Sequence, residues 1–167
     1  GDAGEILKRM GMATVIIPGG ELYEAMKRGT IDAFEYSTLA SNWNMHFNEV
    51  ADYVYLSPVR APSDPQVFFV NKDAWNALPK DLQLLVQTFV DRYAQAQHEY
   101  LVYESIVALE KFKKAGNQVL KVPAEVNAAL AAEADKFYAE KVAKEPPIFG
   151  EIYNSMKAFG EAYETMK

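Results

Sequence analysis

Apolar residues recur at helical spacing along the longest uninterrupted stretch of the chain, residues 80–115, which contain no Gly or Pro. Spacings of three and four residues place apolar side chains on one face of an α-helix. Gly116 follows and ends the pattern. At 1.5 Å per residue such a helix is roughly 50 Å long, which exceeds the width of a small domain. The strict heptads of a coiled coil are not sustained, and we therefore expect a helix that joins two lobes.

The same spacing predicts shorter helices, and Gly or Pro marks most of their ends. We expect helices over residues 3–10, 21–28, 123–144 and 148–166, a helical turn over 73–77, and a loop with a short helix within 38–50. Apolar or alternating runs predict strands over residues 14–17, 31–34, 51–56, 66–70 and 118–122.

Two of the strand runs, at 14–17 and 66–70, are typical of buried strands. The first two strands and the helix between them predict a parallel β-α-β unit with a right-handed crossover, and hence an α/β fold class. Residues 57–65 contain three prolines and cannot be regular structure, so we expect a crossover or hinge there.

Two polar residues, Glu35 and Tyr36, follow the strand predicted at 31–34. In α/β sheets, ligands bind beyond the carboxyl ends of the strands. The pair therefore either lines a ligand-binding crevice or caps the strand. One carboxylate with backbone carbonyls and water suits a hard cation such as Na⁺ or Ca²⁺, and not zinc. The alternative is that the Glu35 carboxylate accepts hydrogen bonds from nearby backbone N–H groups.

Three further residues are candidates for ligand contacts. Trp43 and Phe68 are able to form an apolar wall with a polar edge; Trp43 either closes a pocket or packs under a helix. Phe68 and Phe69 point to opposite faces of their predicted strand, so one of them belongs to the core. The Arg60 guanidinium is suited to clamp a ligand carboxylate, and the alternative is an exposed loop arginine.

Composition excludes several classes of function. The formal net charge of -6 without a basic cluster makes nucleic acid an unsuitable partner. The absence of cysteine excludes disulfides, thiolate nucleophiles and cysteine-based zinc sites. Only two His are present, and nucleophile-elbow, Walker and dinucleotide-binding patterns are absent. No apolar run is long enough to span a bilayer, and the first residues suggest a trimmed or truncated chain.

Four sequence segments together resemble substrate-binding proteins of tripartite ATP-independent periplasmic (TRAP) transporters: GEILKRMG, IPGGELYEAMKRGTIDAFEYS, ADYVYLSP and VNKDAWNALPKDLQLLV. The most specific part is a pair of patterns, R-G-x-I/V-D-[AG]-x-E and N-K-x-x-W-x-x-L-P-x-x-x-Q. The aromatic residue after Glu35 is most similar to the branch whose members bind 2-oxo acids, lactate and similar organic acids, often with a cation.

The resemblance implies a type-II-like periplasmic binding protein, with two lobes joined by crossing strands and one long helix, of which this chain is about the C-terminal half. Residues 1–57 and 116–167 would belong to the second lobe, residues 58–79 to the crossover and a first-lobe strand, and residues 80–115 to the long helix. By the same resemblance, Glu35 and Tyr36 line the cleft. Glu35 would bind the cation through its carboxylate and Tyr36, where relatives usually have Trp, through its backbone carbonyl; Gln66 is the nearest candidate for a further metal-binding residue.

The function that the resemblance implies is a non-enzymatic periplasmic receptor, which captures a small organic acid and delivers it to the membrane permease subunits of a TRAP transporter. The strand at 66–70 would pair with the missing N-terminal half or with a swapped copy of the chain, and the chain alone would bind ligand poorly. Two rival hypotheses are an α/β enzyme that uses Glu35 as general base and a helical interaction protein that binds its partner through the long helix.

Overall fold

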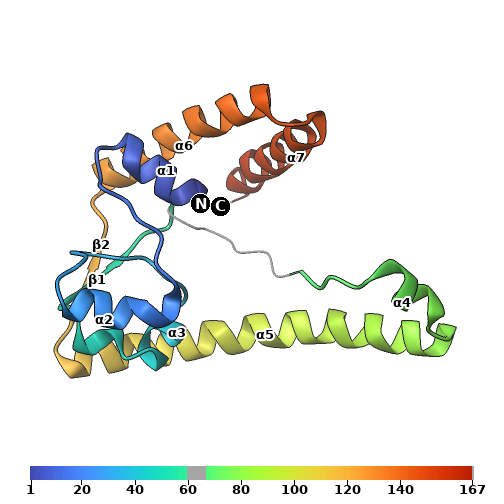
Figure 1. Ribbon diagram of the computed structural model, residues 1–167, viewed down its shortest axis with the longest axis horizontal. Coiled ribbons are helices and arrows are strands. Elements are labelled where there is room, and N and C mark those ends of the chain that lie inside the picture. Colours follow the sequence, from blue (N-terminus) through green and yellow to red (C-terminus); the bar gives the residue numbers. More distant parts are fainter. Residues whose placement is uncertain (60–66, 167) are drawn as a thin grey trace. The chain divides into compact units, whose positions relative to one another are not determined.

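The computed structural model describes residues 1–59 and 67–166 (Figure 1). These residues divide into two units, which are described separately. The first unit comprises residues 1–16, 57–59 and 122–166, and the second comprises residues 17–56 and 67–121. No helix in these ranges combines the length and the apolarity that a membrane crossing requires.

The predicted long helix is confirmed in the second unit as α5, Lys80–Ala115. It begins directly after Pro79 and ends at Gly116, whose φ of 96° is a left-handed conformation that glycine adopts without a steric cost. Strand β2, Gln118–Lys121, follows at once and pairs in parallel with β1, Tyr53–Leu56. The strands predicted at 51–56 and 118–122 are therefore confirmed.

The other elements of the second unit are short. Helix α2, Leu22–Lys27, follows a 3₁₀ turn, η1, at Gly19–Glu21. Helix α3, Leu39–Asn44, is followed by a second 3₁₀ turn, η2, at Phe47–Glu49. Helix α4 spans Lys72–Ala77 and precedes α5.

The junction between α4 and α5 explains the second of the two sequence patterns. Asn71 caps α4, because its Oδ1 accepts hydrogen bonds from the backbone N–H groups of Asp73 and Ala74. The Gln83 side-chain amide donates to the carbonyl oxygens of Trp75, at 2.8 Å, and Leu78, at 3.1 Å. In this pattern Asn71 caps the start of α4, Gln83 binds the carbonyl oxygens at the end of α4, and Pro79 directly precedes α5. The pattern therefore has a structural role.

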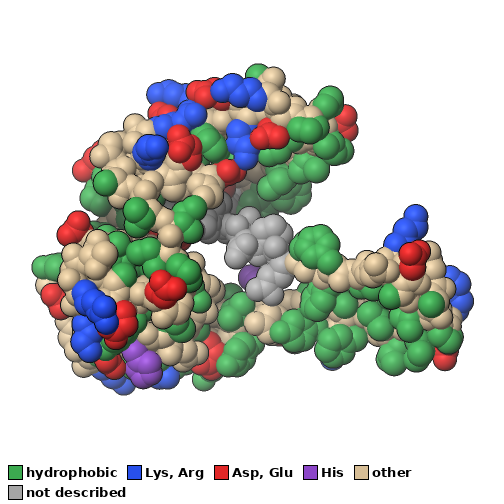
Figure 2. Space-filling view, in the orientation of Figure 1, with side chains coloured by type: hydrophobic (Ala, Val, Ile, Leu, Met, Phe, Trp, Pro, Cys, Tyr) green, Lys and Arg blue, Asp and Glu red, His purple; other side chains and the backbone are tan. Residues whose placement is uncertain are grey.

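The core of the second unit lies against the C-terminal part of α5. Phe112 is 1% exposed, and the edge of Trp43 from α3 packs against it. The N-terminal half of α5 is different, because its apolar side chains lie on the surface. Figure 2 shows hydrophobic side chains gathered along α4 and this half of α5. The exposed apolar side chains of this half of α5 include Leu82, Leu84, Leu85, Val86, Phe89 and Tyr93.

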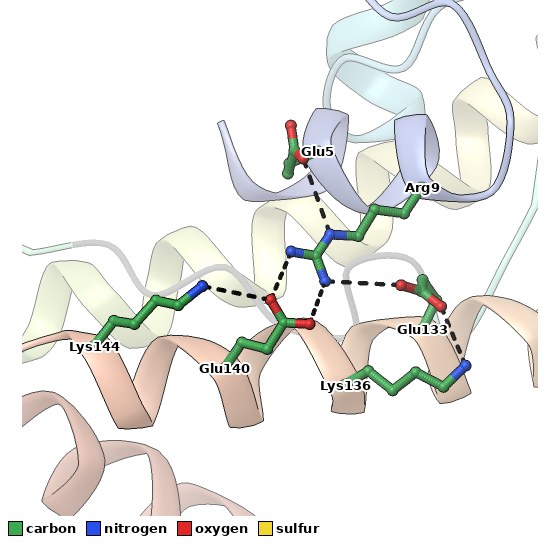
Figure 3. Close-up of polar contacts among 6 residues, drawn as sticks. All are labelled: Glu5, Arg9, Glu133, Lys136, Glu140 and Lys144. Carbon is green, nitrogen blue, oxygen red and sulfur yellow. Dashed lines mark hydrogen bonds and ion pairs between the residues drawn. The ribbon is translucent and has the colours of Figure 1, made fainter.

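The first unit consists of α1, Asp2–Arg9, with α6, Ala124–Lys144, and α7, Pro147–Glu164. Buried Ile6 and Phe137 form its apolar centre. The Arg9 guanidinium donates two hydrogen bonds of 3.0 Å to the Glu140 carboxylate (Figure 3). This contact lowers the pKa of Glu140 and raises that of Arg9. The ion pair thus links α1 to α6 at the surface of the first unit.

Three predicted strands are wrong: residues 14–17, 31–34 and 67–70 are not strands, and the predicted β-α-β unit does not form. Val15, Ile16 and Phe69 are 70%, 84% and 92% exposed, whereas the sequence predicts buried strands. A strand needs a hydrogen-bonded neighbour, which β-branched residues alone do not provide. Within the described ranges only β1 and β2 pair with each other.

Candidate functional site

Glu35 and Tyr36 lie in the loop that connects α2 to α3 in the second unit. Gly29, with a φ of 66°, turns the chain after α2. Thr38 then caps α3 through a hydrogen bond from the Ser41 N–H to its side chain. Glu35 is exposed and Tyr36 is 42% exposed. Both predicted site residues are therefore at the surface of a loop that is fixed at its two ends.

The Tyr36 ring packs against buried Phe47 of η2. The two ring centroids are 5.6 Å apart and the ring planes are nearly perpendicular, at 87°. Phe34 makes a similar edge contact with Phe47, at 4.5 Å. Perpendicular ring pairs of this kind are favourable beyond the area they bury. Phe47 therefore holds the segment on either side of Glu35, a contact that the sequence did not predict.

Trp43 packs against α5 rather than standing free at a pocket. Its ring lies 5.3 Å from that of Phe112 at an angle of 83°, and the Lys111 ammonium lies 5.8 Å from the Trp43 ring centre. Of the two alternatives for this residue, the structure shows the packing contact. Its predicted role in ligand binding stays a prediction.

Phe68 lies on a different part of the second unit. Its ring makes an edge contact with Tyr93 of α5, at 6.0 Å between centroids. It borders a cavity of about 640 Å³ whose lining includes Phe68, Trp75, Val86, Val90, Tyr93 and Leu101. Tyr93 and Phe112 are about 28 Å apart along the helix axis. Phe68 and Trp43 therefore contact distant parts of α5 and do not form one wall within the described residues.

Arg60 and Gln66 lie outside the described residues, so the predicted carboxylate clamp and the further metal-binding residue stay predictions. Among the residues that are described, no group of three or more His, Cys, Asp or Glu side chains could hold a metal ion. The chemistry of Glu35 and the Tyr36 carbonyl nevertheless fits Na⁺ or Ca²⁺, because these cations accept carboxylate, carbonyl and water oxygens together.

A second polar group on this unit was missed by the sequence analysis. The Tyr23 hydroxyl donates to Glu49 Oε2 at 2.8 Å, and His46 Nδ1 lies 3.2 Å from Glu49 Oε1. The hydrogen bond to Glu49 raises the pKa of Tyr23. With Met45 these residues line a hollow of about 370 Å³. His46 and Glu49 are close in sequence, but no sequence signal links Tyr23 to them.

Comparison with known proteins identifies the family. The family model for bacterial extracellular solute-binding proteins, family 7 (DctP), matches residues 1–145. The chain belongs to this family. The monocarboxylate 2-oxoacid-binding periplasmic protein of Nostoc sp. is 28% identical over 160 residues, which are 95% of this chain and 43% of that protein. The family predicted from the sequence motifs is thereby confirmed.

Solved structures of the same family share the fold. A TRAP periplasmic solute-binding protein from Colwellia psychrerythraea, with bound calcium and pyruvate, is 29% identical with a TM-score of 0.84. That match covers 99% of this chain and 51% of the other. One from Pseudoalteromonas atlantica, with bound sodium and pyruvate, is 25% identical with a TM-score of 0.80 and covers 99% and 50% of the two chains.

The chain of this solute-binding protein therefore spans about half the length of the relatives it matches. The predicted periplasmic binding-protein fold is confirmed, and calcium or sodium accompanies pyruvate in the two solved relatives, as predicted for the cation type.

Proposed function

We propose that this solute-binding chain is part of a periplasmic receptor for a small organic acid, such as a 2-oxo acid or lactate, that serves a TRAP transporter. The observation that carries the proposal is the fold match over nearly the whole chain to a relative with bound calcium and pyruvate. The named Nostoc relative supports the same ligand class. The family is one of solute receptors, so the receptor binds and releases its ligand without converting it.

In this proposal Glu35 and Tyr36 face the ligand cleft. The Glu35 carboxylate and the Tyr36 carbonyl contribute two of the about six to eight oxygens that Ca²⁺ takes. The exposed part of the Tyr36 ring forms an apolar wall for the ligand. Arg60 pairs with the ligand carboxylate. Trp43 and Phe68 contact parts of α5 about 28 Å apart, so they do not both reach one small ligand.

The proposal also accounts for the apolar surface of the second unit. Residues 67–70 and the N-terminal half of α5 carry apolar side chains that stay largely exposed within the described residues. We propose that they pack against the other half of the receptor or a swapped copy of this chain. Residues 1–57 and 116–167 then form most of one lobe, 58–79 the crossover, and 80–115 the helix between lobes. Transporter permease subunits are the expected membrane partners.

Calorimetric titration of this chain in the presence of Ca²⁺ tests the ligand class. We expect pyruvate to bind weakly, with a Kd of about 1 mM or higher, because only part of the cleft is present. Glucose, which has no carboxylate, should give no heat beyond dilution. Equal heats from pyruvate and glucose would overturn the ligand class, and micromolar pyruvate binding would overturn the proposal that half the cleft is absent.

Thermal unfolding with Ca²⁺ tests the role of Glu35. At about ten times Kd, a ligand that binds only the folded state raises the melting midpoint by about 3–5 °C in a chain of this size. The Glu35→Gln variant should lose this shift, since an amide has no charge to offer the cation. The exposed Glu21→Gln variant is the matched control and should keep it. An unchanged shift in Glu35→Gln contradicts the assignment.

A further inference from the structure

The ring of Tyr36 lies directly on the backbone of Gly19, the first residue of η1. A Cβ atom built on Gly19 would be 2.5 Å from Tyr36 Cε2 and 3.1 Å from both Cζ and Oη. Carbon atoms in van der Waals contact are about 3.5–4.0 Å apart. Any residue with a side chain at position 19 would therefore displace the Tyr36 ring.

The adjacent glycine is different. A Cβ on Gly20 would meet no atom within 4 Å, although Gly20 belongs to the same 3₁₀ turn. Neither Gly19 nor Gly20 has a positive φ, so backbone conformation does not require glycine at either position. The requirement at position 19 is therefore steric, and it comes from the Tyr36 ring.

Gly19 and Phe47 together form the packing site of the Tyr36 ring. Phe47 is 3% exposed and approaches the ring edge-on, while Gly19 lets η1 lie against it. The side chain thus lies between two separate turns, η1 and η2. A ring held in this way limits the rotation of the Tyr36 backbone, and the Tyr36 carbonyl and the Glu35 side chain belong to that same short segment.

We infer that Gly19 is a positioning residue for the cation and ligand site: its missing side chain makes room for the Tyr36 ring, and the ring orients Glu35 and the Tyr36 carbonyl. This inference rests on the proposed function, because it takes those two groups as ligands. It adds a residue that does not touch the bound molecule, and it explains the use of glycine at position 19 by a contact with a residue in the next loop.

The packing site itself is tested without any ligand. Nuclear Overhauser contacts between the Gly19 Hα protons and the Tyr36 ring protons are expected in the unmodified chain and in Gly20→Ala, and should be lost in Gly19→Ala. Gly19→Ala should lower the melting midpoint by about 3 °C, whereas Gly20→Ala should change it by less than about 1 °C. Absence of these contacts in the unmodified chain would overturn the inference.

A double-mutant cycle separates this contact from a general effect of alanine in the turn. In a Tyr36→Ala background the ring is absent, so Gly19→Ala should leave the melting midpoint unchanged or raise it slightly. A loss of about 3 °C in both backgrounds would overturn the inference. Should Tyr36→Ala fail to fold, Tyr36→Leu serves in its place, because its shorter side chain does not extend to the Cζ and Oη positions.

Calcium titration then distinguishes failure of the inference from failure of the proposed function. With both correct, Gly19→Ala weakens Ca²⁺ binding about fivefold or more, and Gly20→Ala leaves it unchanged. If the unmodified chain binds no Ca²⁺ while the proton contacts and the cycle behave as expected, the packing site stands and its cation role is overturned together with the proposed function. If Ca²⁺ binds equally to Gly19→Ala and the unmodified chain, the positioning role alone is overturned.

Discussion

The two ends of α5 have the same kind of sequence and different surroundings. Near its C-terminal end, Ala108 and Phe112 are buried against α3. Near its N-terminal end, Leu85 and Phe89 follow the same helical spacing but are 64% and 61% exposed. The pattern alone therefore defines the helix and the face it would bury. Which part of that face is covered depends on segments that are distant in sequence.

The comparison also connects the fold to the length of the chain. The packed end of α5 contacts elements from residues 39–44 and 118–121 of this chain. The exposed end contacts the short α4 segment and residues 67–70, and the chain spans about half the length of its relatives. Adjacent exposed apolar side chains, here the apolar stripe of Leu85, Val86 and Phe89, are typical of an interaction surface. This agrees with the proposal that further polypeptide covers it.

Truncating one aromatic ring at each end gives the largest expected difference. Phe112→Ala should lower the free energy of unfolding by about 3–5 kcal/mol, because it leaves a cavity beneath Trp43. Phe89→Ala should change it by less than about 0.5 kcal/mol, since this ring is mostly in water. Urea unfolding followed by circular dichroism measures both. Similar losses in the free energy of unfolding for the two variants would show that the two ends of α5 are equally well packed.

The turn after the packed end offers a second test. The Asn117 side-chain amide donates to the carbonyl oxygens of Asn48, at 2.9 Å, and Ala51, at 2.8 Å. Asn117→Ala leaves both carbonyls without this donor and should cost about 2 kcal/mol in urea unfolding. The matched control is Asn154→Ala on the exposed face of α7, with an expected change below about 0.5 kcal/mol. If Asn117→Ala leaves the free energy of unfolding unchanged, these hydrogen bonds do not stabilise the turn.

A charge introduced on the exposed apolar surface of residues 67–70 and the N-terminal half of α5 should weaken association and leave the stability of the fold unchanged. Phe69 is almost fully exposed, and Phe69→Lys puts a charge beside the apolar stripe. Where a swapped copy covers this surface, as proposed above, self-association measured by sedimentation equilibrium should weaken about tenfold, which corresponds to about 1.4 kcal/mol. Asn44→Lys adds the same charge on α3 and should leave association unchanged. Equal weakening in both would point to net charge as the cause.

The smallest expected change in stability comes from the first unit, at the ion pair between Arg9 and Glu140. The hydrogen bond from Arg9 keeps the pKa of Glu140 below its ordinary value of 4.5. Its stabilisation is therefore fully present above that value and is lost as the pH falls through the lowered pKa. Glu140→Gln should reduce the melting midpoint by about 1–2 °C at neutral pH and by nothing in strong acid. A deficit that persists in acid would mean that the ion pair is not its source.

Much of the helical structure was predictable from sequence, because each helix is specified by its own spacing and by the Gly or Pro at its ends. Residues 80–115 were predicted with the observed bounds for that reason. The strands predicted at 14–17 and 31–34 were wrong, because a strand is specified by its neighbour as well as by its own residues. Thr14 donates instead to the carbonyl oxygen of Gly4.

The candidate site was predictable in the same limited way. Glu35 and Tyr36 were predicted because they follow an apolar run and belong to a family pattern, and their role in binding stays a prediction. Their supports were not found, since Phe47 and Gly19 are ordinary residues whose importance comes from the fold. The link between Tyr23 and Glu49 was missed for the same reason. Local patterns single out candidate residues, whereas the contacts around those residues are visible only in the folded chain.

The abrupt end of α5 has a mechanical consequence. Gly116 stops the helix, Asn117 is bonded to the turn before β1, and the Gln118 N–H donates to the Asp52 carbonyl oxygen. Only Gly116 and Asn117 separate α5 from β2, so the end of the helix is held close to the sheet. With a rod of 36 residues, a tilt of about 10° at this joint swings the far tip by about 9 Å. A small rearrangement beside β1 would thus produce a much larger displacement at the N-terminal end of α5.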